Sequence, residues 1–301
     1  LLQAARVDAA VFAGRSLADG LLAQIEPRAR PAVQDLVYGS LRAYGRGDFV
    51  LARLLSKPLP QDEVRALLLV TLYRLESQSH AAHTVVDQAV AAAGEIAGGA
   101  FRALVNAVLR NFLRRQKEFL AALAGDPLGA AQHPEWWLRR LQHSWPQDWP
   151  GIVAAGNGPP PMALRVNRRR CGRDDYCARL AAEGVAATPV GEDGLALERP
   201  LPVDKLPGFA DGLVSVQDPG AQMAAPLLDP NPGSRVLDAC AAPGGKAAHL
   251  LERADLDLLA LDLKPARCRR VVENFTRLGL AATVMAADCT QFARWWDGRP
   301  F

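Results

Sequence analysis

The sequence predicts a multidomain protein: an all-α bundle, then a small α+β segment, then a parallel α/β sheet. Three observations lead to this fold class. Apolar residues recur at helical spacing through residues 1–122, the pattern becomes mixed over 123–212, and strands alternate with helices over 213–301. Strand–helix alternation is typical of a parallel sheet, and a helical run of about 120 residues is long enough to form its own domain.

The composition is that of a folded protein rather than a disordered or fibrous one. Of the 301 residues, 50% are hydrophobic and 22% are charged. No apolar run approaches the roughly 18 residues that a membrane span needs. The 5 cysteines form no CxxC pair and the 5 histidines no HxxxH or HExxH pattern, so neither a disulfide framework nor a metal site is expected. With no visible secretion signal, we expect a cytoplasmic protein.

Residues 1–122 are expected to be helical throughout and to carry the basic surplus of the chain, with 15 basic and 11 acidic side chains. Breaks are expected at turn-forming glycines and prolines, among them Gly14, the segment 45–47 and the pair 98–99. The helices expected are Ala4–Phe12, Pro31–Leu41, Val50–Leu55, Glu63–Leu75, Thr84–Ala93 and Phe101–Phe112.

A polar strip follows the last of these helices. Arg102, Asn106 and Arg110 lie four residues apart and therefore share one face, away from the apolar positions. Such a face is either simply solvated or a strip that contacts RNA phosphates. Arg102 and Arg110 are therefore candidate RNA-binding residues.

The middle segment, 123–212, has mixed patterns. A short helix is expected from His133, a strand over 162–167, a helix over 174–183 and a hairpin near Gly212. Five guanidiniums fall within nine residues of this segment. A charge run is usually a solvated turn, but beside a strand and a helix it could also grip an RNA backbone. The candidate RNA-binding residues here are Arg165, Arg168, Arg169 and Arg170, with Arg173 completing the run.

Residues 213–301 alternate between strands and helices. Strands are expected over 213–216, 235–238, 258–262 and 282–286. Helices are expected from Asp218, an N-cap residue followed by proline, to about residue 228, and over 265–278. Acids stand at or just after successive strand ends, at positions 238, 262 and 288. This order is typical of a nucleotide-binding sheet.

The segment Asp238-Ala-Cys-Ala-Ala-Pro-Gly-Gly-Lys246 follows the second of these strands. It is not a phosphate-binding Walker A loop, which needs Gly at the position of Cys240 and Ser or Thr at the position of Ala247, and it is not GxGxxG. Its small residues still let backbone N–H groups approach a ligand, and the helix that follows attracts a carboxylate.

Two acids further along the chain complete the pattern of a ligand site. Asp262 is placed to accept hydrogen bonds from ribose hydroxyls, and Asp288 could accept one from an exocyclic amine. A ligand with a carboxylate, a ribose and an adenine amine but no phosphate is S-adenosyl-L-methionine. The alternative is a tight turn beside ordinary strand-end acids. The combination of the loop with Asp262 and Asp288 makes this alternative the weaker interpretation.

The segment 238–246 resembles the first cofactor motif of the RNA cytosine-C5 methyltransferases, the Sun and NOP2/NSUN group. The segment 206–218 is similar to that family's lead-in to its catalytic domain. The helical N-terminus, with Val-Asn-Ala-Val-Leu-Arg at 105–110, looks like the NusB-type RNA-binding domain of the bacterial Sun/RsmB branch. The resemblance covers nearly the whole chain, and Ala247, where the family often has Thr, is its visible departure in the loop. By motif position it assigns the cofactor contacts to Cys240, Ala241, Ala242, Pro243, Gly244, Gly245, Lys246, Asp262 and Asp288.

The resemblance implies the first half of a Rossmann-like class I methyltransferase sheet, in an enzyme that uses S-adenosyl-L-methionine to methylate a cytosine at C5 in 16S ribosomal RNA. We expect a monomer that needs no metal and no membrane. The family mechanism uses two cysteines, in an Asp-Ala-Pro-Cys loop and a Thr-Cys-Ser loop, and neither loop is present. We therefore expect a C-terminally truncated, inactive chain with its nucleophile beyond residue 301, and packing roles for Cys240, Cys268 and Cys289.

Two alternatives stay open at the level of the sequence. One is a non-catalytic, NusB-like RNA-binding factor of the antitermination type, and the other is a methyltransferase that acts on a different RNA. The intact cofactor loop with two acids after it favours an enzyme, and the NusB-like segment favours ribosomal RNA.

Overall fold

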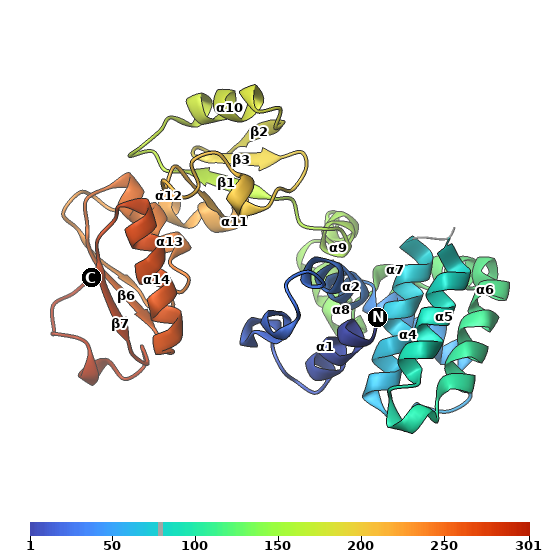
Figure 1. Ribbon diagram of the computed structural model, residues 1–301. Coiled ribbons are helices and arrows are strands. Elements are labelled where there is room, and N and C mark those ends of the chain that lie inside the picture. Colours follow the sequence, from blue (N-terminus) through green and yellow to red (C-terminus); the bar gives the residue numbers. More distant parts are fainter. Residues whose placement is uncertain (78–80) are drawn as a thin grey trace. The chain divides into compact units, whose positions relative to one another are not determined.

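The computed structural model describes residues 1–77 and 81–301, which form two compact units, Leu1–Pro159 and Pro160–Phe301 (Figure 1). The first unit is helical and the second contains two sheets. The predicted fold class is confirmed, since a helical bundle precedes a small α+β fold and a parallel α/β sheet. Within the described ranges, no helix is both long and apolar enough to cross a membrane.

The first unit contains every helix that the sequence predicts for its first 122 residues. Its α-helices are α1 (Leu2–Phe12), α2 (Arg30–Arg42), α3 (Tyr44–Leu54), α4 (Asp62–Ser77), α5 (Ala82–Ala93), α6 (Arg102–Gly125), α7 (Pro127–Ala131), α8 (Glu135–Ser144) and α9 (Trp149–Asn157). Single 3₁₀ turns lie at Leu17–Asp19, Leu21–Gln24 and Ala97–Gly99.

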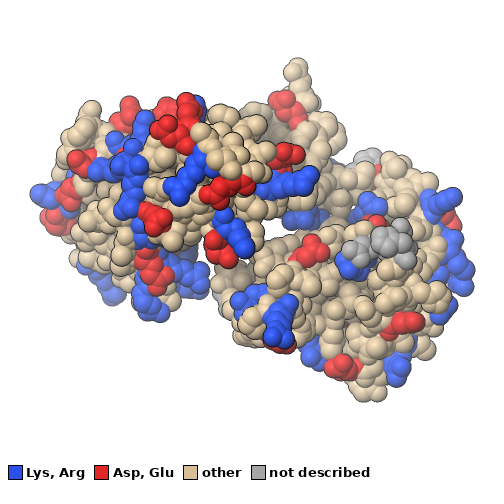
Figure 2. Space-filling view, turned by 45° about the horizontal axis from the view of Figure 1, so that its top comes forward, with Lys and Arg blue, Asp and Glu red and all other residues tan. Residues whose placement is uncertain are grey.

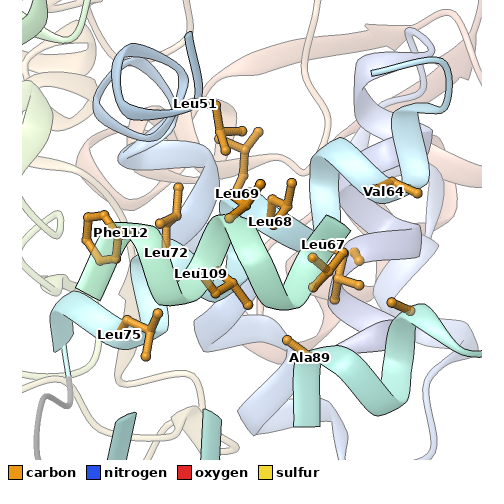
Figure 3. Packing of buried hydrophobic residues seen from close by; sticks show 14 of the residues in the cluster. Leu51, Val64, Leu67, Leu68, Leu69, Leu72, Leu75, Ala89, Leu109 and Phe112 are labelled. Atoms are coloured by element: carbon orange, nitrogen blue, oxygen red, sulfur yellow. The ribbon is translucent and has the colours of Figure 1, made fainter. Parts of the chain in front are cut away.

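The helix α4 forms the centre of this unit. It packs against α1, α2, α3, α5 and α6, and it is apolar around most of its circumference, as a fully surrounded helix must be. Figure 3 shows its leucines between side chains from neighbouring helices. The labelled core residues are Leu51, Val64, Leu67, Leu68, Leu69, Leu72, Leu75, Ala89, Leu109 and Phe112.

Two details of the bundle differ from the expected pattern. The chain turns at Ala43, between α2 and α3, and not at Gly45 to Gly47, which lie inside α3. A Cβ on Gly47 would come within 2.6 Å of Leu69 Cδ2, so this glycine lets α3 pack closely against α4 and does not mark a turn. The last helix, α6, also runs on to Gly125, because it continues past a kink at Arg115.

The second unit begins with a four-stranded antiparallel sheet in the order β2-β3-β1-β4. Its core lies between the sheet and α10. Leu164 and Val166 of β1 and Tyr176 of α10 belong to this core, and the residue between Leu164 and Val166 faces the other side of the sheet. The elements are β1 (Ala163–Val166), α10 (Arg173–Ala182), β2 (Ala187–Val190), β3 (Gly194–Leu197), a 3₁₀ turn (Val203–Lys205) and β4 (Val214–Val216).

Two expectations for this sheet are corrected. The hairpin lies at the turn between β2 and β3 and not near Gly212. The strand Val214–Val216, expected at the start of the α/β segment, pairs antiparallel with β1 and so belongs to the four-stranded sheet. Its end leads directly to Asp218, which caps the next helix by accepting a hydrogen bond from the N–H of Ala221.

A parallel sheet in the order β5-β6-β7 completes the second unit. Helices α13 and α14 contact it and each other, and they bury a core that includes Val236, Leu251, Ala260 and Phe275. The expected helix after Asp218 is divided in two at Met223. The elements are α11 (Pro219–Gln222), α12 (Ala224–Leu228), β5 (Arg235–Asp238), α13 (Gly245–Arg253), β6 (Asp257–Asp262), α14 (Pro265–Leu278), β7 (Thr283–Ala286) and a 3₁₀ turn (Phe292–Arg294).

Candidate cofactor site and RNA-contact residues

The loop between β5 and α13 is held against the neighbouring strand. Its Ala241 N–H donates a hydrogen bond of 2.8 Å to the carbonyl oxygen of Leu261, which continues the pairing of β5 with β6. The peptide bond between Ala242 and Pro243 is cis. Gly244 then has φ +98°, and a Cβ there would lie 3.1 Å from Val271 Cγ1, so this position needs glycine. The loop therefore delivers the first turn of α13 to the carboxyl edge of the sheet.

Asp262 lies at that edge, at the end of β6, and is only 2% exposed. Its Oδ2 accepts a hydrogen bond of 3.2 Å from the N–H of Ala242, and its Oδ1 accepts one of 3.3 Å from the N–H of Lys264. The guanidinium of Arg267 lies 3.5 Å from Oδ1. A carboxylate has about four lone-pair sites, so acceptor capacity remains beyond these two hydrogen bonds.

Asp288 follows β7, the next strand of the same sheet. The N–H of Ala287 donates to the carbonyl oxygen of Asp262 at 3.0 Å, which places Asp288 beside the end of β6. The Thr290 hydroxyl and N–H donate to Asp288 Oδ1 at 2.6 Å and 2.9 Å, and these hydrogen bonds lower the pKa of the Asp288 carboxyl. Asp288 is therefore an ionised acceptor at neutral pH.

Three side chains join this site that were not among the candidates from the sequence. Asp238, at the end of β5, accepts a hydrogen bond of 3.3 Å from the N–H of Cys240, and burial raises the pKa of its carboxyl. From α14, Asn274 Nδ2 donates to the carbonyl oxygen of Pro243 at 2.8 Å, and Arg267 Nη2 donates to that of Ala242 at 3.1 Å. The strand-end position of Asp238 is a signal that could have found it, whereas the contacts from α14 depend on tertiary packing.

The donor and acceptor set of this edge fits S-adenosyl-L-methionine. The first N–H groups of α13 have no partner within the helix and are attractive to a carboxylate. The missing side chain at Gly244 lets the loop pack closely against Val271 and Phe275 of α14, which holds the start of α13 at this edge. Asp262 ends β6 and Asp288 follows the adjacent strand β7, so two acceptors for hydroxyl and amine groups lie at the same edge. The part of the chain that the structure describes contains no group of three or more His, Cys, Asp or Glu that could hold a metal.

The cysteines are scattered over the second unit. Cys240 and Cys289 are exposed, and Cys268 is buried in α14 with its Sγ 3.6 Å from the carbonyl oxygen of Asp262. Cys171, just before α10, and Cys177, within α10, are half-buried, and burial raises the pKa of the Cys171 thiol.

The structure corrects the interpretation of Arg165 as an RNA contact. This side chain is 0% exposed and forms a bidentate ion pair with Glu252 of α13. Because Leu164 and Val166 face the core beneath α10, the alternation of β1 directs Arg165 to the opposite face of the sheet. Its guanidinium is therefore unavailable to a phosphate group in this structure.

The neighbouring arginines retain exposed surface but also have partners within the protein. Arg168 lies 3.6 Å from Asp193, and Arg169 lies 2.6 Å from Asp255. Arg170 donates to the carbonyl oxygen of Asp211. These residues thus anchor the turn after β1 to surrounding segments, and their contact with RNA stays a prediction.

In the first unit, Arg102 and Arg110 are exposed on the same side of α6. Arg110 Nε donates to Asn106 Oδ1 at 2.9 Å, so the strip expected from the four-residue spacing exists as a surface of this helix. Figure 2 shows that basic and acidic side chains are interspersed on the face in view. Whether the strip contacts RNA stays a prediction.

Family comparisons divide the chain in the same order as the fold. Residues 7–114 match the NusB family, residues 133–204 match the RsmF/B-like methyltransferase ferredoxin-like domain, and residues 225–301 match 16S rRNA methyltransferase RsmB/F. Among solved structures, the crystal structure of PH0851 is similar with a TM-score of 0.70 at 19% identity, covering 89% of this chain and 63% of that one. A methyltransferase homolog protein from Pyrococcus horikoshii is similar with a TM-score of 0.50 at 27% identity, covering 56% and 57%.

Curated relatives match along the whole chain. Ribosomal RNA small subunit methyltransferase B of Pseudomonas putida is 45% identical, and the match covers 100% of this chain and 71% of that protein. The protein of the same name from Escherichia coli is 37% identical, with coverages of 100% and 72%. These matches do not support the expectation of a truncated chain. With the loop and strand-end acids described above, they show that the chain belongs to the ribosomal RNA small subunit methyltransferase B family.

Proposed function

We propose that this protein binds S-adenosyl-L-methionine at the carboxyl edge of the β5-β6-β7 sheet and serves the methylation of a cytosine at C5 in 16S ribosomal RNA. The observation that carries the proposal is the convergence of the loop 240–246, Asp262 and Asp288 at that edge. The name shared by the relatives supports small-subunit ribosomal RNA as the substrate.

In this proposal each part of the edge has a separate role. The N–H groups at the start of α13 hold the carboxylate of the cofactor, Asp262 accepts from its ribose hydroxyls and Asp288 accepts from its adenine amine. Lys246 is exposed beside the loop and adds positive charge near the carboxylate. When bound, the cofactor supplies an electrophilic methyl group.

The chemistry at the base requires a nucleophile because C5 of cytosine reacts poorly by itself. A thiolate that adds to C6 makes C5 an enamine-like carbon, which can take the methyl group; loss of the C5 proton and departure of the thiolate then restore the ring. The target base must first be unstacked from the RNA.

We propose that none of the five cysteines of this chain provides the thiolate. Cys268 is buried beneath the loop, and Cys240 belongs to the cofactor loop itself. None of the five occurs in a Pro-Cys or Thr-Cys-Ser sequence like those that the resembled family uses. The 301-residue chain alone is therefore expected to bind the cofactor without transferring its methyl group.

RNA binding in this proposal depends on both units. The exposed strip of Arg102 and Arg110 on α6 is one contact, and the turn that contains Arg168, Arg169 and Arg170 is another. Arg165 is excluded because it is buried. We further propose a cytoplasmic monomer. Its functional segments are proposed to be 1–122, 123–212 and 213–301, except that β4 belongs to the sheet of the middle segment.

The test is nucleoside analysis of deproteinised 16S ribosomal RNA after incubation with methyl-labelled S-adenosyl-L-methionine. A chain that also carries the two cysteine loops of the resembled family is expected to form 5-methylcytidine, and a different methylated nucleoside would contradict the assignment to cytosine C5. The 301-residue chain is expected to give no label above background. Labelled 5-methylcytidine from that chain would show that one of its own cysteines is the nucleophile.

A further inference from the structure

One buried guanidinium connects the antiparallel sheet to the candidate cofactor loop. Arg165 Nη1 donates a hydrogen bond of 2.7 Å to the carbonyl oxygen of Gly245, the first residue of α13. The same nitrogen donates to Gln217 Oε1 at 2.6 Å. Arg165 lies in β1 and Gln217 directly follows β4, so both side chains come from the four-stranded sheet. They meet at the start of α13, which packs against the parallel sheet.

The remaining donors of Arg165 fix its orientation. Nε and Nη2 donate to the two carboxylate oxygens of Glu252 at 2.8 Å and 2.7 Å, which is the bidentate geometry that only a guanidinium provides. Glu252 is seven residues after Gly245, so two turns of α13 bring both to one face of the helix. The ion pair with Glu252 therefore aims Nη1 at the carbonyl group of Gly245.

Stability alone does not explain this arrangement. The side chains of Arg165 and Glu252 are 0% and 1% exposed, and a buried ion pair commonly contributes no more stability than apolar side chains of the same volume. What apolar side chains could not reproduce is the hydrogen bond to Gly245. That bond fixes the first turn of α13, whose N–H groups face the loop end of the helix.

We propose that Arg165 is a positioning residue for the amino-acid end of S-adenosyl-L-methionine, acting through the Gly245 carbonyl group to hold the start of α13 in place. This inference rests on the proposed cofactor site and adds a residue from the preceding antiparallel sheet to its support. Asp262 ends β6 and Asp288 follows β7, so the positions of the ribose and adenine acceptors do not depend on Arg165.

The two ends of the ligand therefore give different responses to a change at Arg165. S-adenosylhomocysteine has the carboxylate, the ribose and the adenine, whereas 5′-methylthioadenosine lacks the amino-acid end. In calorimetric titrations of the 301-residue chain, Arg165→Lys is expected to weaken binding of S-adenosylhomocysteine about 10-fold to 100-fold, as loss of a charge-assisted hydrogen bond implies. Binding of 5′-methylthioadenosine is expected to stay within about twofold of the wild-type value.

Two further variants keep the test decisive. Arg179→Lys changes an exposed arginine on α10 that has no role in the proposed sites, and it is expected to leave both affinities unchanged. The double variant R165M/E252M removes the buried charges together, so it avoids a lone buried carboxylate if Arg165→Lys does not fold. It is expected to show the same selective loss.

The outcomes separate this inference from the proposed function. Equal weakening of both ligands, or no weakening of either, in the variants at Arg165 would overturn the positioning role while leaving the cofactor site intact. Failure of the wild-type chain to bind either ligand would overturn the cofactor site itself and, with it, this inference.

Discussion

The carboxylate of Asp262, at the end of β6, accepts a hydrogen bond of 3.2 Å from the N–H of Ala242 in the loop that follows β5. The residue expected to hold the ribose therefore also braces the loop expected to hold the carboxylate of the cofactor. Removal of the Asp262 carboxylate should therefore weaken the contacts with both the ribose and the amino-acid end of the cofactor. A change at Arg165, in contrast, should affect the amino-acid end alone.

Asp262→Ala is expected to weaken binding of S-adenosyl-L-methionine by about 1–3 kcal/mol, because ribose hydroxyls and a loop N–H lose their acceptor. Equilibrium dialysis with labelled cofactor measures the change. Asp255→Ala is the matched control, since Asp255 is exposed in the turn before β6. An affinity equal to the wild-type value in Asp262→Ala would remove this residue from the site.

Gly244→Ala is expected to destabilise the second unit and to weaken cofactor binding. The residue has φ +98°, and the added Cβ would lie 3.1 Å from Val271 Cγ1. Gly233→Ala is the control. Gly233 has φ +82°, so an alanine there has the same backbone strain, but nothing lies within 4 Å of the added Cβ. Both variants should lose about 1 kcal/mol from the left-handed backbone, and Gly244→Ala should lose more. Urea unfolding measures the difference, and equal losses would contradict a tightly packed loop.

Charge reversal of Arg102 and Arg110 together is expected to weaken binding of 16S ribosomal RNA and to flatten its salt dependence. Each lost phosphate contact should reduce the slope of log affinity against log salt by about 0.7–0.9. The control reverses Arg28 and Arg139, which are exposed in the same unit, and so changes the net charge equally. A slope that falls equally in both variants would indicate that net charge, and not the strip on α6, governs binding.

Asp8 makes the stability of the helical unit depend on pH. This side chain is 0% exposed, it accepts a hydrogen bond of 2.6 Å from the Ser40 hydroxyl, and burial raises the pKa of its carboxyl from 3.8 to about 7. A raised pKa means that the folded protein favours the protonated acid. The resulting stability is complete below pH 3.8 and is lost as pH rises through about 7.

Between pH 5 and pH 8 the wild-type chain should therefore lose on the order of 2 kcal/mol of unfolding free energy through Asp8. Asp8→Asn keeps the shape of the side chain without the charge, so most of this loss should vanish. Asp87→Asn, a change on the exposed surface of α5, should leave it in place. Chemical unfolding at the two pH values provides the measurement, and an unchanged pH dependence in Asp8→Asn would show that Asp8 is not responsible.

The sequence predicted the helices and the parallel strands because each has a strong local signal. The period of the apolar residues places α4 and α14, and the acids at strand ends place Asp262 and Asp288 at one edge of a sheet. The hairpin of β2 and β3 was missed because Pro189 lies within β2, and proline argues against a strand. The structure places β2 at the edge of its sheet, where proline is tolerated.

Arg165 shows which part of the site the sequence could not reveal. Its position in an arginine-rich run made RNA contact a natural interpretation, although the alternation in β1 already separates it from Leu164 and Val166. The face of the sheet that Arg165 lies on is covered by α13, and its ion-pair partner there, Glu252, is 87 residues away in the chain. No local pattern carries that information, and for the same reason the contacts of Asn274 and Arg267 with the loop could not be foreseen.

Hydrogen exchange of the backbone amides with and without S-adenosyl-L-methionine tests the proposed cofactor site most directly. Added cofactor should slow exchange in the loop 240–246, after β6 at 262–264 and after β7 at 287–290, while amides of the helical unit at 1–159 exchange as before. Protection confined to other segments, or no protection at saturating cofactor, would contradict a site at the carboxyl edge of the β5-β6-β7 sheet.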